Sequence, residues 1–185
     1  ANLTLVEWSN LTPNLWEIGL TSTALVQGTA TYTVNANIVM VLDLYISTGS
    51  PATDRILLPV SRTDYASYPN KTQQGYPNVY WFNRLTTPTL TFWPVPDGGG
   101  PYTLNYYAVR QTQDAEFING QNVEIPYRHL DAFVAALAWR LSQIYQPGAA
   151  GEMMKLSERA WQIASTQDVE NIGINIYPIL SGYYR

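Results

Sequence analysis

The pattern of apolar residues changes once along this chain, and that change sets the fold class. From Trp16 to about Arg110, runs rich in Thr, Val, Tyr and Ile alternate with Gly, Pro and Asn clusters. Turn signals about every ten residues are typical of compact antiparallel β-structure. From Pro126 onward, apolar residues recur at helical spacing instead. The sequence therefore predicts an α+β fold: an antiparallel β-sandwich or barrel-like module packed with a C-terminal antiparallel helix pair and an extended C-terminal arm.

The β region should hold about six or seven strands. Their expected ranges are residues 16–20, 29–34, 38–47, 55–60, 79–85, 89–95 and 101–109. Residues 29–34 and 103–109 approach a two-residue alternation, so one face of each strand should be buried. The glycine-rich segment 97–100 should form a hairpin tip, since glycine enters left-handed turns without steric cost.

The most regular helical pattern follows Pro126, a residue suited to the first turn of a helix. Apolar residues then recur in alternating steps of four and three: Leu130, Val134, Leu137, Leu141 and Ile144. Alanines between them leave small faces on which another helix can approach closely. A second helix is expected over residues 151–171, and the short break at Pro147-Gly148 predicts that the two helices are antiparallel.

A length of 185 residues predicts a single domain. Within it we expect a helix remnant over residues 1–13, the β module over 14–125, the helix pair over 126–172 and a docking arm over 173–185. The arm is apolar and aromatic, with interruptions at Pro178 and two glycines. A segment this apolar should dock on its own sheet or on another subunit.

The amino-acid composition limits the kinds of partner that this chain can bind. Charged residues make up 13% of the chain, against about 25% in ordinary soluble domains, so large subunit contacts are expected. A net charge of -4 with ten Lys and Arg lacks the basic footprint that grips DNA or RNA. The absence of cysteine excludes disulfides and fits folding in a reducing cytoplasm. No apolar run approaches the roughly 18 residues of a membrane span.

No catalytic, cofactor-binding or metal-binding set stands out. The single histidine, His129, lies at a helix start, where a histidine is more often a capping or surface group than a catalytic base. Ser61 and Ser67 have no nucleophile motif around them, and the aspartates lack calcium-loop spacing. We predict that the chain is not an enzyme and uses no cofactor or metal.

The six Trp and fourteen Tyr allow two interpretations. Aromatic residues on strands can form a sugar-stacking platform, or they can pack cores and interfaces. Trp81, Trp93, Tyr106 and Tyr107 discriminate between them. An exposed coplanar row of these four would support glycan binding, whereas burial would end that interpretation. Packing is the favoured alternative.

Several motifs together resemble one protein family. They are Glu7-Trp8 with Asn14-Leu-Trp16, Arg62-x-x-Tyr65, Asn70-Lys-Thr-Gln-x-Gly75-x-Pro77, Trp93-Pro-Val-Pro-Asp97, Pro126-Tyr-Arg128 before the Ala-rich helix, Ala160-x-x-x-Ala164 and the terminal Tyr-Tyr-Arg185. Over nearly the whole chain, this order is similar to the head-to-tail connector (adaptor, head completion) proteins of tailed bacteriophages, particularly short-tailed ones. Such proteins usually begin with further helices before the Glu7-Trp8 equivalent, so the chain should start within that helix.

The resemblance implies a virion protein of the head-tail junction, made in the host bacterial cytoplasm and assembled as a ring of about twelve copies. It implies contacts with the portal and with a tail or nozzle protein, and DNA that passes through the lumen without specific binding. Candidate interface residues are Trp81, Trp93, Pro94, Pro96, Tyr127, Arg128, Tyr177, Tyr183, Tyr184 and Arg185. The alternatives are a tail-tube or nozzle subunit and, less favoured, a β-sandwich glycan-binding module.

Overall fold

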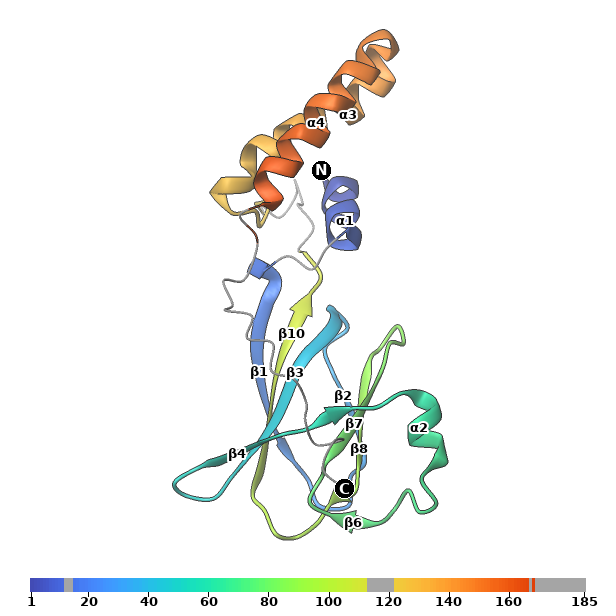
Figure 1. Cartoon of the computed structure of the whole chain (residues 1–185), viewed down its shortest axis with the longest axis vertical. Helices are drawn as coiled ribbons and strands as arrows, with labels where there is room; N and C mark the ends of the chain where they lie inside the picture. The colour runs from blue at the N-terminus through green and yellow to red at the C-terminus, as the bar shows by residue number, and fades with distance from the viewer. Residues whose placement is uncertain (12–14, 113–121, 167, 169–185) are drawn as a thin grey trace, which may run out of the picture. The chain divides into compact units, whose positions relative to one another are not determined.

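The computed structural model describes residues 1–11, 15–112, 122–166 and 168, and it divides into two compact units. Unit 1, Ala1–Tyr127, holds the β-structure, and unit 2, Arg128–Arg185, holds two long helices (Figure 1). The predicted α+β class with antiparallel sheets and two C-terminal helices is confirmed. The single-domain organisation stays a prediction, and the predicted arm over 173–185 lies outside the described residues.

Unit 1 contains two four-stranded sheets arranged as a sandwich. The first sheet, in the order β1-β10-β3-β4, is antiparallel throughout and is built from β1 (Ile18–Leu25), β10 (Tyr102–Arg110), β3 (Ile38–Thr48) and β4 (Thr53–Ile56). The second, in the order β2-β8-β7-β5, is built from β2 (Thr31–Thr33), β8 (Thr89–Trp93), β7 (Val79–Asn83) and β5 (Leu58–Pro59), with β5 and β7 parallel. A small parallel pair joins β6 (Gln74–Gly75) to β9 (Val95–Pro96). The described strands do not close into a barrel.

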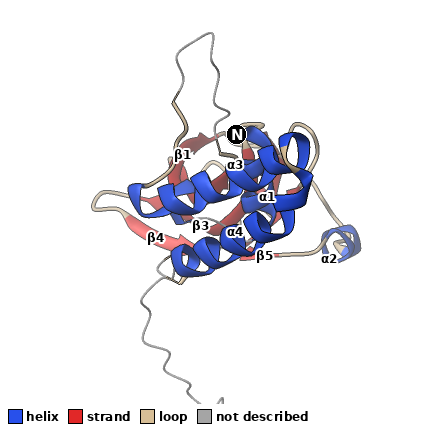
Figure 2. Cartoon of the chain, turned by 90° about the horizontal axis from the view of Figure 1, so that it is seen from above, coloured by secondary structure: helices blue, strands red, loops and turns tan. Residues whose placement is uncertain are grey.

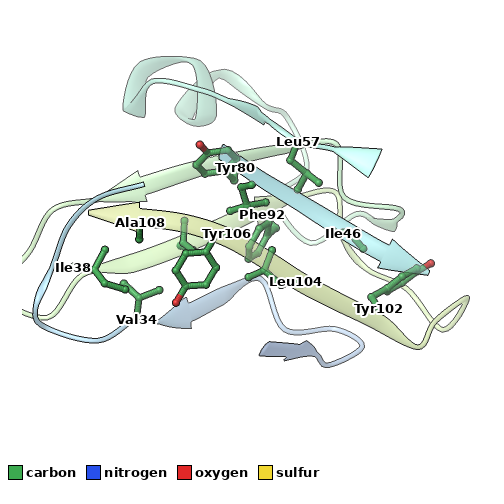
Figure 3. Close-up of a cluster of buried hydrophobic side chains, with 12 residues drawn as sticks. Val34, Ile38, Ile46, Leu57, Tyr80, Phe92, Tyr102, Leu104, Tyr106 and Ala108 are labelled. Carbon is green, nitrogen blue, oxygen red and sulfur yellow. The ribbon is translucent and has the colours of Figure 1, made fainter. Parts of the chain in front are cut away.

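The hydrophobic core lies between the two sheets, where alternate side chains point inward (Figure 3). On β10 the buried residues Tyr102, Leu104, Tyr106 and Ala108 follow the predicted two-residue alternation. Phe92 of β8 is fully buried opposite them. Burial of a large apolar side chain contributes about 1.5–3 kcal/mol, so this cluster holds the two sheets together.

A row of polar side chains crosses the outer face of the first sheet. Ser22 Oγ on β1 donates to Asn105 Oδ1 on β10 at 2.6 Å, and Asn105 Nδ2 donates to Ser47 Oγ on β3 at 2.8 Å. Ser47 Oγ then donates to Asp54 Oδ1 on β4 at 2.5 Å. Each hydrogen bond joins neighbouring strands, and a slip of one residue would turn these side chains to the other face. The polar row therefore helps to fix the register of all four strands.

The glycine-rich segment 97–100 is not the predicted hairpin tip. It leads into β10 of the first sheet from β8 and β9, which belong to other sheets, so it carries the chain across the sandwich. Asp97 Oδ1 accepts hydrogen bonds from the Gly99 amide at 2.9 Å and from the Tyr102 hydroxyl at 2.5 Å. A Cβ on Gly99 would lie 2.8 Å from the Tyr102 hydroxyl oxygen. Close approach, rather than a left-handed turn, is what requires glycine here.

Other local differences from prediction concern short elements. The described residues form ten strands rather than about six or seven, because several are pieces of two or three residues. The predicted strand 55–60 is split between the two sheets, with Leu57 buried at the break. Helix α2 (Arg62–Ser67) was not expected. It opens with a capping box in which Ser61 Oγ accepts from the Asp64 amide at 3.1 Å.

The first element of the described structure is a helix. Helix α1 (Asn2–Leu11) buries Leu5 and Trp8. Ser9 Oγ lies 3.0 Å from Thr112 Oγ1, and the Thr112 hydroxyl donates to the carboxylate of the buried Glu17. Glu17 ends the 3-10 turn η1 (Leu15–Glu17) directly before β1, and Thr112 follows β10. These contacts tie α1 to the end of the pair where β1 begins and β10 ends.

Unit 2 is a helical hairpin. Helix α3 (Leu130–Tyr145) follows the 3-10 turn η2 (Tyr127–His129), and helix α4 (Ala150–Ser165) follows the turn η3 (Pro147–Ala149). The two helices pack against each other, and Figures 1 and 2 show them side by side. A connection this short makes the pair antiparallel, as predicted.

Candidate functional site

The apolar stripe predicted on α3 is largely exposed. Leu130, Val134, Leu141 and Ile144 are between 48 and 73% exposed, and only Leu137 is half-buried. Their alternating steps of four and three residues are the spacing of a coiled-coil seam, along which a second helix packs. The sequence predicted which residues share this face of α3 but not that the face is open.

The side chains that α3 buries lie on another face. They are Ala132, Phe133 and Ala136, and the centre of this face lies roughly a third of a turn from the centre of the stripe at 3.6 residues per turn. Two of the three are alanines, which allow close packing on that side. The larger aliphatic side chains of the stripe are therefore left available to other molecules.

Helix α4 adds to the exposed apolar surface. Leu156 and Ile163 are both exposed and lie seven residues apart, so they share one face of the helix. Ser157 and Ala164 are the buried residues of α4, again a small pair. We define the hairpin surface as the exposed apolar residues Leu130, Val134, Leu141, Ile144, Leu156 and Ile163.

A shallow groove of about 250 Å³ continues the hairpin surface near the turn between the helices. It is lined by Ala138, Leu141, Ser142, Tyr145, Gln146, Ala149 and Met153. Leu141 belongs to both the stripe and the groove, so the two are continuous. A contiguous apolar surface of this kind is typical of a protein-protein contact. The hairpin surface is therefore the candidate functional site.

The base of the hairpin is held by charged and aromatic residues. Arg128 Nη2 lies 2.9 Å from Asp168 Oδ1 in an ion pair. His129 is fully buried, with its ring centroid 6.2 Å from that of Trp161. Burial lowers the pKa of His129, Arg128 lowers it further, and Asp168 acts in the opposite direction.

This position corrects the expectation for His129. The residue stands at the N-cap of α3, but its side chain does not cap the helix, and it is not on the surface. The imidazole of His129 is instead buried beside the ring of Trp161. Sequence pattern alone could not show this, because a helix start is where a histidine is usually exposed.

The two tryptophans of the predicted interface are covered by neighbouring aromatic rings. Tyr65 stacks on Trp81 with ring centroids 5.6 Å apart, and Tyr68 stacks on Trp93 at 4.2 Å with an interplanar angle of 11°. Trp93 Nε1 also donates to the Asn70 carbonyl at 2.9 Å. These contacts fasten the segment that contains α2 onto the second sheet.

The four residues chosen to test glycan binding do not form an exposed row. Tyr106 is buried in the core. Tyr107, its neighbour on β10, points to the opposite face of the first sheet because side chains alternate along a strand. Trp81 and Trp93 belong to the second sheet and are stacked under tyrosines. The condition that would have supported a sugar platform is not met by these residues.

The other predicted interface residues fall into three groups. Pro94 and Pro96 are buried within the chain. Tyr127 is 90% exposed and Arg128 is exposed as well. Tyr177, Tyr183, Tyr184 and Arg185 lie outside the described residues. Their role in an interface stays a prediction.

Two other kinds of site are absent from the described residues. Within these residues, no three His, Asp or Glu side chains come together in a group that could hold a metal ion. In the same part of the chain, no helix is both long and apolar enough to cross a membrane.

The β-sandwich and the exposed apolar face of the hairpin define an α+β protein with a candidate protein-contact surface. The family model described as SU10 adaptor protein matches residues 2–172, nearly the whole chain. The chain belongs to the SU10 adaptor protein family. This is a family of structural bacteriophage proteins, and it confirms the resemblance to phage adaptors. A search of curated proteins finds no match.

Proposed function

We propose that this protein is a head-to-tail adaptor that forms a ring between the portal and the tail of the virion and extends the DNA channel. The family supports the adaptor role, and the hairpin surface is the observation that supports ring assembly. Burial of these aliphatic side chains between copies provides the driving force, at about 25 cal/mol per Å² of apolar area.

The hairpin surface can support a ring because both helices contribute to it. The stripe lies on α3, and Leu156 and Ile163 lie on α4. When α3 of one copy packs on α4 of the next, each copy keeps one free surface for a further neighbour. Head-to-tail contacts of this kind close into rings when the rotation between copies closes. The proposed ring has about twelve copies, as in the short-tailed phage adaptors that the sequence resembles.

The charge of the chain suits a channel through which DNA moves. Each copy carries a net charge of -4, so a ring accumulates negative charge. A negatively charged lumen repels the phosphate backbone and lets DNA slide past without sticking. A strongly basic lumen in the assembled ring would contradict this part of the proposal.

We also propose that residues 173–185 act as an arm that docks on the portal. The sequence of this segment is apolar and aromatic, which favours a docked state over a solvated one. The test is a chain that ends at Ile172. It should lose portal affinity, and normal portal binding by this truncated chain would refute the arm.

The experiment that tests the proposed function measures mass in solution, by light scattering or native mass spectrometry, for the protein alone and mixed with portal rings. A stoichiometric collar of about twelve copies on the portal is the expected result. A protein that stays monomeric and ignores the portal would overturn the adaptor proposal. Rings that form alone and bind tail proteins but not the portal would favour a tail-tube or nozzle subunit, which would use the same hairpin surface.

A further inference from the structure

Both edges of the first sheet are open. Within the described residues, β1 pairs only with β10 and β4 pairs only with β3. The edge strand β1 is eight residues long and contains no proline and no charged residue. Isolated proteins usually protect such an edge with charges, proline or a bulge, because it is a template for pairing with another strand. An edge this long and unprotected suits a strand from another molecule.

The directions of the edge strands allow copies to join edge to edge. The sheet has four antiparallel strands, so β1 and β4 run in opposite directions. Two copies in the same orientation would therefore bring β1 of one beside β4 of the other as an antiparallel pair, without turning either copy over. This contact uses two different surfaces, which is the geometry that a ring requires.

The exposed side chains of the two edges lie on the same face of the sheet. Ser22 pairs with Asn105, Asn105 with Tyr45, and Tyr45 with Ile56, and directly paired residues share a face. Leu20 and Asp54 are two residues away from Ser22 and Ile56, so they share that face too. Leu20 is 50% exposed and Ile56 is 77% exposed.

One register matches these side chains. With Leu20 opposite Ile56, Ser22 stands opposite Asp54, so an apolar pair and a polar pair form together. A shift of two residues in one direction puts Ile56 opposite Ser22. The opposite shift puts Asp54 opposite Leu20, which would bury a carboxylate beside an aliphatic side chain. The matched register also brings Asp54 of one copy next to Ser22, the first residue of the polar row in the other.

We infer that β1 of one copy pairs with β4 of the next in this register, so that the first sheet continues from copy to copy around the assembly. The inference rests on the proposed ring and gives it a second contact, independent of the hairpin surface. The occupant of the open β1 edge is thus a second copy of this chain.

A cysteine pair tests the register. The chain has no cysteine, so Leu20→Cys with Ile56→Cys introduces the only thiols. Oxidation of the assembled protein should produce a ladder of covalent multimers on a non-reducing gel, and either single variant should produce none. The matched control is Ala24→Cys with Ile56→Cys. It shifts the partner by four residues, about 13 Å along the strand, which is too far for a disulfide.

The outcomes separate this inference from the proposed function. Assembly on the portal without a ladder overturns the sheet contact and leaves the adaptor proposal intact. Absence of assembly in the unmodified protein overturns both. A covalent dimer from Leu20→Cys alone would show that β1 pairs with β1 and would overturn the inference. In the unmodified protein, amide hydrogen exchange along β1 should slow on assembly, and unchanged exchange there would contradict the pairing.

Discussion

The two units place the same kinds of side chain in opposite environments. In the sandwich, Leu44 is 1% exposed and Phe92 is fully buried, whereas in the hairpin Leu141 is 53% exposed. Two facing sheets enclose a core within one chain. Two helices leave further faces open, and here one open face is aliphatic along its length. The sandwich therefore encloses its own core within one chain, whereas the hairpin exposes an aliphatic face.

The largest effect should come from a charge placed in the α3 stripe. Val134→Asp should abolish assembly on the portal while the monomer stays folded, because a buried unpaired carboxylate opposes helix contact. Native mass spectrometry measures assembly, and circular dichroism measures folding. Gln143→Glu is the control: Gln143 is exposed on a different face of the same helix, and this variant should assemble normally. Assembly by Val134→Asp would place the interface elsewhere.

A matched pair of leucines compares the units directly. Leu44→Ala should lower the free energy of unfolding by about 2–5 kcal/mol, because it removes buried methyl groups and leaves a cavity. Leu141→Ala should change it by no more than about 0.5 kcal/mol in the monomer, since its side chain is already half in water. Denaturant unfolding of the monomer measures both. Equal losses would mean that the stripe is covered within the chain.

A smaller loss of stability is expected from a substitution at the outer face of the second sheet. Tyr68→Ala removes the ring that stacks on Trp93 and should cost about 0.5–1.5 kcal/mol. Tryptophan fluorescence should shift as Trp93 becomes more exposed. Tyr127→Ala is the comparison, since this side chain is 90% exposed and its loss should be nearly neutral. If Tyr68→Ala changes neither the stability nor the tryptophan fluorescence, the stack does not fasten the α2 segment.

The hairpin should lose stability in mild acid. The pKa of His129 is lowered in the folded state from its usual 6.5, chiefly by burial. Between pH 6.5 and the folded-state pKa the unfolded chain binds the proton more readily, so the stability of unit 2 falls as pH drops below 6.5. Thermal melts of the helical signal at several pH values measure this. His129→Gln should reduce the slope, and an unchanged slope would assign it to other groups.

The stability of the sandwich should instead change at alkaline pH. The hydrogen bond to Asp97 raises the pKa of Tyr102 from 10.0 to about 12. The unfolded chain loses this proton first, so the contribution of neutral Tyr102 is complete below pH 10 and is lost between pH 10 and about 12. Tyr102→Phe should remove this part of the alkaline loss of stability. An identical alkaline profile for both proteins would contradict the assignment.

Periodicity predicted the fold class and the helical hairpin because these depend on local patterns over many residues. The alternation on β10 and the steps of four and three on α3 are examples. Periodicity identifies residues that share a face, but it does not say what covers that face. The exposure of the α3 stripe therefore became visible only in the structure, although its coiled-coil spacing was already in the sequence.

Short elements and long-range connections were beyond the same reasoning. Helix α2 has six residues, fewer than two turns, so no periodic pattern can establish it. The glycines at 98–100 indicate a turn, but nothing local indicates that the next strand joins the other sheet. Pro94 separates β8 from β9, whereas Pro96 lies within β9 opposite Gly75, and both prolines are buried, because proline lacks a backbone donor and still packs well.

The contact between Glu17 and Thr112 has a consequence for the architecture of the chain. Ile18 at the start of β1 and Val109 near the end of β10 are direct partners, with Cα atoms about 5 Å apart. The hydrogen bond between Glu17 and Thr112 joins the residues just before β1 and just after β10. The polypeptide therefore enters β1 and leaves β10 at the same end of the first sheet. Modules with adjacent ends can be exchanged as cassettes. The sandwich between Glu17 and Thr112 can therefore be replaced by another β module while the flanking helical segments keep their sequences.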